Sequence, residues 1–301
     1  MSAYLPETKY SIPRDGGNLS YFRYGKPSSK NILAIHGVTS SNRAWQCFAK
    51  TLNRFGFTIY AVDLRGRGDS NSIQGPFGMA KHAADMEAVL DHANIDACDV
   101  IGHSMGGFVV TAMTAICPTR IDRAVLIDGG IPLALPPGFT AEMVLPLVLG
   151  PALARLAMTF QNQDEYLAYW KPQAAFERGW SEVLDEYVTY DLRGKSPNMQ
   201  ASTNAKAVEA DSADLFGDPL IVNALLNLNS EVLFIRAVRG LQNEEIPLYP
   251  QSVIEAALEN YPKVKLLTLD DVNHYEILLD QGCADRCIDL VYPELNVLGA
   301  K

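Results

Sequence analysis

Residues 100–108 read Val-Ile-Gly-His-Ser-Met-Gly-Gly-Phe, so three glycines surround one serine at the end of an apolar run. Residues 102–106 fit the pattern G-x-S-x-G, in which the serine occupies a sharp turn between a strand and a helix. A bulky side chain two positions from the serine would collide with such a turn, so glycine is expected at both of those positions. The stretch therefore predicts that the Ser104 hydroxyl is presented at the carboxyl edge of a sheet.

The segments on either side of Ser104 have the pattern that this turn requires. The apolar run at 99–103 predicts a buried strand, and the spacing over 105–117 predicts a helix. The N-terminus of that helix faces Ser104, where its free N–H groups favour developing negative charge. In this context the motif indicates a catalytic serine and not a chance match in a glycine-containing loop.

Short apolar runs alternate with helical segments along most of the chain. Further strands are predicted at 31–36, 57–62, 123–128, 231–237 and 264–269, further helices at 44–55, 79–93, 251–260 and 276–291, and a hairpin at 8–24. Such alternation is typical of an α/β fold with a mostly parallel sheet and helices on both faces.

The middle of the chain interrupts this alternation. Between Ile131 and about Leu228 no clear strand is apparent. This segment contains prolines, aromatic residues and a helical stretch over 142–160. Long connections inside a compact domain are usually functional. We therefore expect a helical cap, or lid, at 131–228, inserted into a core formed by 1–130 and 229–301.

A serine hydroxyl needs a base to become a nucleophile, and the five histidines are the natural candidates. They are His36, His82, His92, His103 and His274. His82 and His92 fall on a helix that we expect at the surface, and the His103 side chain is expected to point away from Ser104. His274 follows the strand at 264–269, in a loop that can fold back over the serine. We therefore expect His274 to act as general base and then as general acid.

Several motifs together resemble the α/β-hydrolase superfamily, and more narrowly its lipase- and esterase-like serine hydrolases. They are His36-Gly37, DLRGRGDS at 63–70, GHSMGG at 102–107 and NHY at 273–275. The match covers essentially the whole chain, and residues 131–228 stand where this family carries its cap. The resemblance implies an α/β-hydrolase fold and a Ser-acid-His catalytic triad in that chain order.

The acid of the triad departs from the family's commonest pattern, an aspartate after the penultimate strand. In that place the stretch 237–247 contains Glu244 and Glu245 but no aspartate. Haloalkane dehalogenase-like members instead carry the acid after the strand that follows the nucleophile helix. Asp128 has that position, so we expect Asp128 to orient His274, with Glu244 and then Glu245 as alternatives.

The resemblance also implies an oxyanion hole made by two backbone N–H groups. One belongs to Met105, directly after the nucleophile, and the other to Val38 in the loop HGVTSS. The DLRGRGDS stretch lacks the order of a phosphate-binding loop. We therefore expect Arg65 and Arg67 to have structural roles, as partners of nearby carboxylates and carbonyls.

The composition limits the partners and the location of the protein. The net charge is −10 and the isoelectric point is near 5.0, which argues against nucleic acid or anionic lipid as the main partner. Five cysteines without zinc-like spacing indicate packed thiols in a reducing compartment. With no signal-peptide pattern in MSAYLPETKY and no apolar stretch long enough to span a bilayer, we expect a cytoplasmic protein, a monomer or homodimer. The histidine spacing suggests no metal site, and triad hydrolysis needs no cofactor.

The function that the sequence favours is a serine hydrolase of carboxylic esters that acts through an acyl-enzyme. Apolar residues in the cap indicate an apolar ester of small to medium size, with lactones and thioesters as further candidates. Serine as nucleophile disfavours dehalogenase and epoxide-hydrolase chemistry, which use a carboxylate there. A catalytically silent small-molecule receptor and a Ser-His-dependent lyase or carbon–carbon hydrolase remain alternatives.

Overall fold

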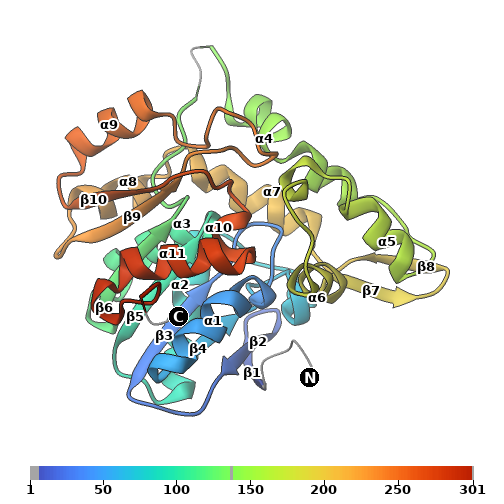
Figure 1. Cartoon of the computed structure of the whole chain (residues 1–301), viewed down its shortest axis with the longest axis horizontal. Coiled ribbons are helices and arrows are strands. Elements are labelled where there is room, and N and C mark those ends of the chain that lie inside the picture. Colours follow the sequence, from blue (N-terminus) through green and yellow to red (C-terminus); the bar gives the residue numbers. More distant parts are fainter. Residues whose placement is uncertain (1–6, 136–137, 300–301) are drawn as a thin grey trace.

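The computed structural model describes residues 7–135 and 138–299, and it is built on one eight-stranded sheet (Figure 1). The spatial order of the strands is β1-β2-β4-β3-β5-β6-β9-β10. Their bounds are β1 Glu7–Arg14, β2 Gly17–Tyr24, β3 Lys30–Ile35, β4 Phe57–Val62, β5 Cys98–His103, β6 Ile121–Ile127, β9 Val232–Ala237 and β10 Val264–Leu269. The first two strands form the predicted hairpin and β2 is antiparallel to β4, while every pairing from β4 to β10 is parallel. The predicted α/β fold with a mostly parallel sheet is confirmed.

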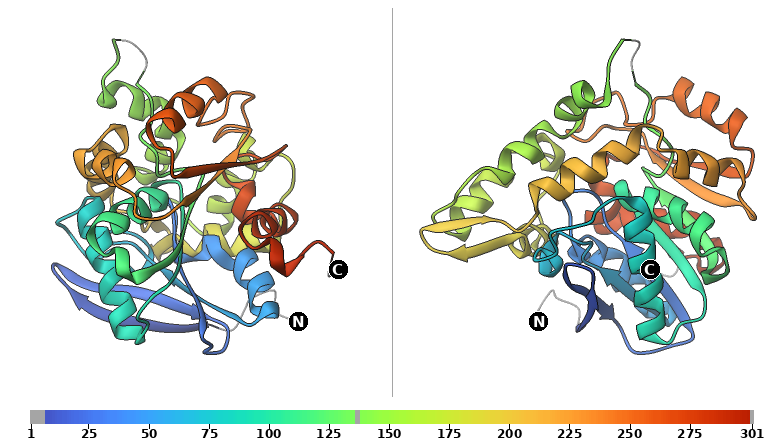
Figure 2. Two further views of the ribbon diagram at one scale, coloured as in Figure 1. Left: turned by 90° about the vertical axis from the view of Figure 1, so that its left-hand side faces the viewer. Right: turned by 180° about the vertical axis from the view of Figure 1, so that it is seen from behind.

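Helices cover both faces of the sheet, which explains why the inner strands are mostly apolar. The helices that pack on the sheet are α1 Gln46–Leu52, α2 Met79–Ala93, α3 Met105–Ile116, α8 Pro219–Leu226, α9 Gln251–Asn260, α10 Glu276–Leu279 and α11 Gln281–Val291. Figure 1 shows α1 and α11 in front of the sheet, and the reverse view in Figure 2 brings α2 and α3 to the front. Two buried apolar clusters follow this division, one containing residues of α2, α3 and α8 and the other residues of α1, α10 and α11.

Successive residues of one strand alternate between these two clusters. In β3, Leu33 and Ile35 belong to the cluster of α2 and α3, whereas Ile32 and Ala34 belong to the cluster of α1 and α11. This is the period-2 alternation of a strand that is buried on both faces. Because β3, β5 and β6 are parallel neighbours, their carboxyl ends meet at one edge of the sheet. The predicted site residues follow the strands at this edge.

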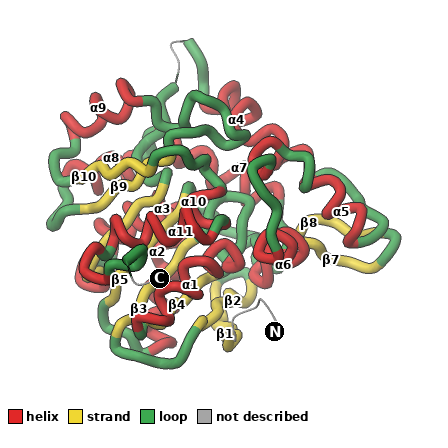
Figure 3. The backbone as a smooth tube through the Cα atoms, in the orientation of Figure 1, coloured by secondary structure: helices red, strands yellow, loops and turns green. Residues whose placement is uncertain are grey.

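The long segment between β6 and β9 is mostly helical, as Figure 3 shows. It contains α4 Ala141–Leu156, α5 Gln163–Trp170, α6 Glu182–Tyr190, β7 Leu192–Lys195, β8 Asn198–Ala201 and α7 Ala205–Ala213, and it ends in α8. The expectation of no strand in this segment was wrong, because β7 and β8 form an antiparallel hairpin. Each of these strands has four residues, most of them polar and partly exposed, so no apolar alternation marks them in the sequence.

We propose that residues 131–228 act as the cap, with α8 as the segment that returns to the core. The aromatic side chains of α5 and α6 pack in the buried cluster of α1 and α11, while α8 packs against α3. Within the described residues, no helix is both long enough and apolar enough to cross a membrane.

Candidate active site

Ser104 lies between β5 and α3 with a left-handed backbone conformation, φ 54° and ψ −125°. The strand–turn–helix prediction for this stretch is confirmed. A β-carbon at Gly102 would lie 2.1 Å from the Gly106 carbonyl oxygen, and one at Gly106 would lie 2.1 Å from the Ile35 carbonyl oxygen. Both contacts are far shorter than real β-carbons show, so the close backbone packing around Ser104 requires glycine at both positions.

Asp128 and His274 form a buried pair at the same edge of the sheet. Asp128 directly follows β6 with φ 45°, and one of its carboxylate oxygens lies 2.7 Å from His274 Nδ1. The other oxygen accepts a hydrogen bond of 3.2 Å from the backbone N–H of Ala237, at the end of β9. A carboxylate at Nδ1 holds the proton on that nitrogen and leaves the Nε2 lone pair available to accept another.

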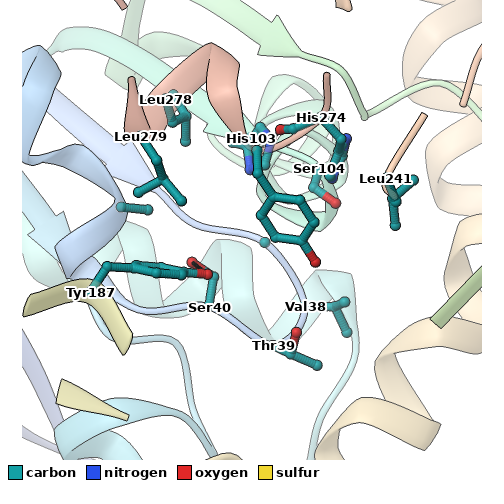
Figure 4. Close-up of a pocket in the computed structure, with 13 residues that line it drawn as sticks. Val38, Thr39, Ser40, His103, Ser104, Tyr187, Leu241, His274, Leu278 and Leu279 are labelled. Atoms are coloured by element: carbon teal, nitrogen blue, oxygen red, sulfur yellow. Dashed lines mark hydrogen bonds between the residues drawn. The ribbon is translucent and has the colours of Figure 1, made fainter. Parts of the chain in front are cut away.

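Ser104 and His274 line one cavity of about 430 Å³. Figure 4 shows the Ser104 side chain beside the His274 ring. The wall of the cavity also contains Ser40, Tyr187, Leu241, Tyr275, Leu278 and Leu279. Tyr187 comes from the cap helix α6, so the cap forms part of this wall.

The alternative acids lie away from this pair. Glu244 is exposed, and its carboxylate accepts a hydrogen bond of 2.8 Å from the backbone N–H of Gln242 in its own loop. Glu245 is also exposed. In the structure it is Asp128, and not Glu244, that contacts His274.

The expected oxyanion donors, Val38 and Met105, both lie next to Ser104 in the wall of one cavity. Met105 is the first residue of α3, where a backbone N–H has no partner within the helix. Val38 follows the end of β3, and both residues line a cavity that Ser104 also lines. Within the described part of the chain, neither N–H donates a backbone hydrogen bond, so both are available to a ligand.

The loop that carries Val38 is held by a buried histidine. His36 Nδ1 donates to the Gly37 carbonyl oxygen over 2.7 Å, while its Nε2 accepts from the Leu64 N–H over 3.0 Å. Burial lowers the pKa of His36 to about 3, so the ring is neutral near pH 7. In a trans peptide the C=O and N–H groups point to opposite sides. Tying the Gly37 carbonyl to His36 therefore directs the Val38 N–H away from this ring.

Arg65 and Arg67 have the structural roles that we expected. Arg67 Nε donates to the Val38 carbonyl over 2.9 Å, and its guanidinium pairs with Asp211 of the cap helix α7. Arg65 Nε lies 2.6 Å from Asp85 of α2, and both side chains are buried. These pairs join the loop of Val38 to α2 and to the cap.

His82 departs from the expectation of a surface position. It is completely buried, and its Nε2 lies 3.0 Å from Asp211. The reason is that the cap helix α7 covers this part of α2. His92, near the end of the same helix, is exposed, with Nδ1 2.7 Å from the Tyr21 hydroxyl.

The expectation that His103 points away from Ser104 was also wrong, because its side chain lines the same cavity as Ser104 and His274. Its ring centroid lies 4.5 Å from that of His274, and its Nε2 lies 2.8 Å from the His274 carbonyl oxygen. A β-carbon built on Gly37 would lie 3.4 Å from Ser104 Oγ and 3.6 Å from His103 Nδ1, so both atoms face that glycine. Strand alternation fails here because the left-handed residue at 104 breaks the strand. Burial and the neighbouring His274 ring lower the pKa of His103 well below its usual range, which keeps the ring neutral.

Sequence reasoning missed the cavity residues Tyr187, Tyr275 and Leu241. For Tyr275, its position directly after His274 in the sequence was a signal that it lies at the site. Tyr187 and Leu241 reach the site only through tertiary packing. No group of three or more histidine, cysteine or acidic side chains within residues 7–135 and 138–299 is arranged to hold a metal ion.

The sheet, the turn at Ser104 and the buried histidine–aspartate pair define a protein of the α/β-hydrolase class. Consistent with this, the alpha/beta hydrolase fold family matches residues 30–214, and the chain belongs to that family. Two solved structures share the fold. One is an E-2-(acetamidomethylene)succinate hydrolase, which covers 94% of this chain and 98% of its own with a TM-score of 0.73 and 17% identity. The other is a thioesterase domain from the curacin biosynthetic pathway, with the same TM-score and identity over 93% and 98% of the two chains.

Among curated relatives, an abhydrolase domain-containing protein of Schizosaccharomyces pombe is 24% identical over 84% of this chain and 89% of its own length. The N-formylmaleamate deformylase of Pseudomonas putida is 36% identical over 38% of this chain and 44% of its own. A bifunctional esterase/perhydrolase of Acinetobacter calcoaceticus is 30% identical over 41% and 45%. The last two matches thus cover less than half of either protein.

Proposed function

We propose that this protein is a serine hydrolase that cleaves carboxylic esters through an acyl-enzyme, with Ser104, His274 and Asp128 as its catalytic triad. The observation that carries the proposal is the contact of 2.7 Å between Asp128 and the His274 ring. This ring lines the same cavity as Ser104. The curated relatives named as deformylase and esterase/perhydrolase support acyl-transfer chemistry in particular.

In the proposed reaction, His274 Nε2 takes the proton of the Ser104 hydroxyl while the serine oxygen attacks the ester carbonyl carbon. The negative charge on the carbonyl oxygen is stabilised by the N–H groups of Val38 and Met105. Collapse of this intermediate breaks the bond to the alcohol, which leaves with the proton from His274.

A water molecule then attacks the acyl-enzyme and gives its proton to His274. Release of the acid returns that proton to the oxygen of Ser104. Asp128 stabilises the positively charged ring in both steps because its carboxylate is bonded to Nδ1.

Turnover of 4-nitrophenyl esters tests this function. We expect hydrolysis by the wild-type protein and a loss of about 10³-fold or more in kcat for Ser104→Ala. A fluorophosphonate probe should label the wild-type protein and leave Ser104→Ala unlabelled. A correctly folded wild-type protein that shows neither turnover nor labelling would favour the alternative of a silent small-molecule receptor.

Product analysis distinguishes hydrolysis from the chemistry of a lyase on the same residues. An ester hydrolase releases one acid and one alcohol for each water consumed, whereas a lyase releases no such pair. The cavity that Tyr187 helps to line is compatible with either reaction, so this assay is needed beside the first.

We also propose that the protein acts in the cytoplasm on an ester of small to medium size. All five cysteines, each within the described part of the chain, are free thiols, which supports a reducing compartment. Burial raises the pKa of the thiols of Cys47 and Cys98 to about 12, so neither is a reactive thiolate near pH 7.

A further inference from the structure

Ser104 borders two cavities of different chemistry. The first, which we call the histidine-side pocket, is the cavity of about 430 Å³ that His274 lines. The second, which we call the apolar pocket, shares Ser104, Val38 and Leu241 with the first. Figure 4 shows Leu241 on one side of Ser104, and Ser40 with Tyr187 on the other.

The apolar pocket is formed by hydrophobic side chains from separate parts of the chain. They are Phe108 of α3, Leu133 after β6, Leu215 and Phe216 after α7, and Leu241 and Leu248 between β9 and α9. The backbone N–H of Leu133 donates to the Leu215 carbonyl over 2.8 Å, which ties two walls together. Asp128 is the one charged residue among the described residues of this wall, and its carboxylate oxygens already bond to His274 and Ala237.

The histidine-side pocket carries hydroxyl groups near the serine. Ser40 and Tyr187 contact one another, with 3.2 Å between their oxygens, and Thr39 and Tyr275 also line this pocket, beside the apolar side chains of Ala44, Leu278 and Leu279. Hydroxyl groups both donate and accept hydrogen bonds, so this side suits a ligand with hydroxyl or amide groups.

The proposed reaction determines which part of a substrate enters each pocket. The leaving group takes a proton from His274, so it must lie on the side that His274 lines. The carbonyl oxygen must face the N–H groups of Val38 and Met105. Val38 lines both pockets, whereas Met105 lines only the apolar pocket. The remaining substituent of the carbonyl carbon is the acyl chain, and the apolar pocket is the space left for it.

We propose that the apolar pocket binds the acyl chain of an uncharged apolar acid, while the histidine-side pocket binds a polar, hydroxylated leaving group. This assignment rests on the proposed hydrolase function. An acyl chain ending in a carboxylate is excluded, because no cationic side chain is among the described residues that line the apolar pocket and burying an unpaired charge is costly. The substrate class is therefore an apolar acyl ester of an alcohol that carries at least one further hydroxyl or amide group.

A matched pair of esters tests the acyl pocket. The 4-nitrophenyl esters of pentanoic acid and of succinic acid have acyl groups of similar length, and they differ in terminal charge. We expect kcat/KM to be about 100-fold or more higher for the pentanoate. Equal rates for the two esters would overturn the proposal, whereas no hydrolysis of any ester would overturn the hydrolase function itself.

Filling the pocket tests its location. Leu215→Trp should lower the ratio of kcat/KM for hexanoate over acetate by at least about tenfold. Leu226→Trp is the control, because Leu226 is 55% exposed on α8 and should leave the ratio unchanged. Should Leu215→Trp fail to fold, Leu248→Ala enlarges the same pocket and should raise the relative rate for branched acyl groups. An unchanged acyl ratio in a folded Leu215→Trp or Leu248→Ala protein would contradict the assignment.

A variant of Tyr187 tests the histidine-side pocket. Tyr187→Phe removes a hydroxyl that contacts Ser40, so it should lower the preference for glyceryl butyrate over propyl butyrate about fivefold. A shift in acyl preference instead, with the alcohol preference intact, would show that the two pockets have the reverse roles.

Discussion

Two regions of this molecule are held together in different ways. Around Ser104 backbone packs against backbone, with Gly106 so close to β3 that a β-carbon would lie 2.1 Å from the Ile35 carbonyl oxygen. In the cap, side chains pack against side chains through aromatic contacts and buried ion pairs such as Arg155–Asp191. Backbone packing restricts the residue type at each position, whereas side-chain packing accepts many combinations of similar volume. The site should therefore tolerate far less change than the cap.

The largest expected effect is on catalysis at the sheet edge. Asp128→Asn should lower kcat for a 4-nitrophenyl ester by about 10⁴-fold, because the amide no longer holds His274 in the required tautomer. The matched variant Glu244→Gln should stay within about twofold of the wild type, since Glu244 is exposed and bonds to its own loop. Steady-state kinetics checks both, and a severe loss in Glu244→Gln alone would identify Glu244 as the acid.

Next in size is the difference between two glycines. Gly106→Ala should lower the free energy of unfolding by at least about 3 kcal/mol, because backbone atoms of β3 and its following loop must move. Gly179→Ala in the cap meets no atom within 4 Å and should change it by less than about 1 kcal/mol. Urea denaturation measures both values. Similar losses in the two variants would remove the proposed difference between the regions.

The smallest expected effect is a difference in pH dependence. The pKa of His36 is about 3 in the folded protein, below the usual value of 6.5, so between these values a proton binds the unfolded chain and not the folded one. The contribution of His36 to the free energy of unfolding is therefore fully present above about pH 6.5. Below that pH it falls by about 1.4 kcal/mol per pH unit. His36→Gln should remove this contribution, seen as a shallower slope of unfolding free energy between pH 6 and 4.

The cap should respond to pH in a lower range. Burial alone would raise the pKa of Asp211, but His82 and Arg67 outweigh it and hold the pKa below its usual range. Burial of Asp191 is likewise outweighed, by Arg155 and the hydrogen bonds of Ser202 and Tyr166. These carboxylates contribute stability above their usual pKa of about 3.9 and lose it only as the pH falls below that value. If the free energy of unfolding changed with pH equally steeply above pH 4 in the wild type and in His36→Gln, the proposed assignment of this pH range to His36 would be contradicted.

Much of the fold could be predicted because its signals are local. The bounds of α2 and β4 agree with the periodicity of the sequence, and the turn at Ser104 follows from glycine spacing. The hairpin of β7 and β8 escaped prediction because its strands are short and polar. His82 and His103 were misplaced for different reasons, the first because the cap covers it and the second because the serine's own conformation ends the strand.

The sequence by itself determined the strained turn at Ser104, since its geometry depends on a few neighbouring residues and on the absence of β-carbons among them. It also determined the parallel sheet, through the alternation of apolar runs with helical segments. Only the tertiary structure decided that Asp128 contacts His274 and that two cavities of different polarity flank the serine. Asp128 and His274 lie 146 positions apart in the sequence, and the residues that line each cavity are spread even more widely. Their distances in space depend on the packing of the whole sheet and cap and not on any local preference of the chain.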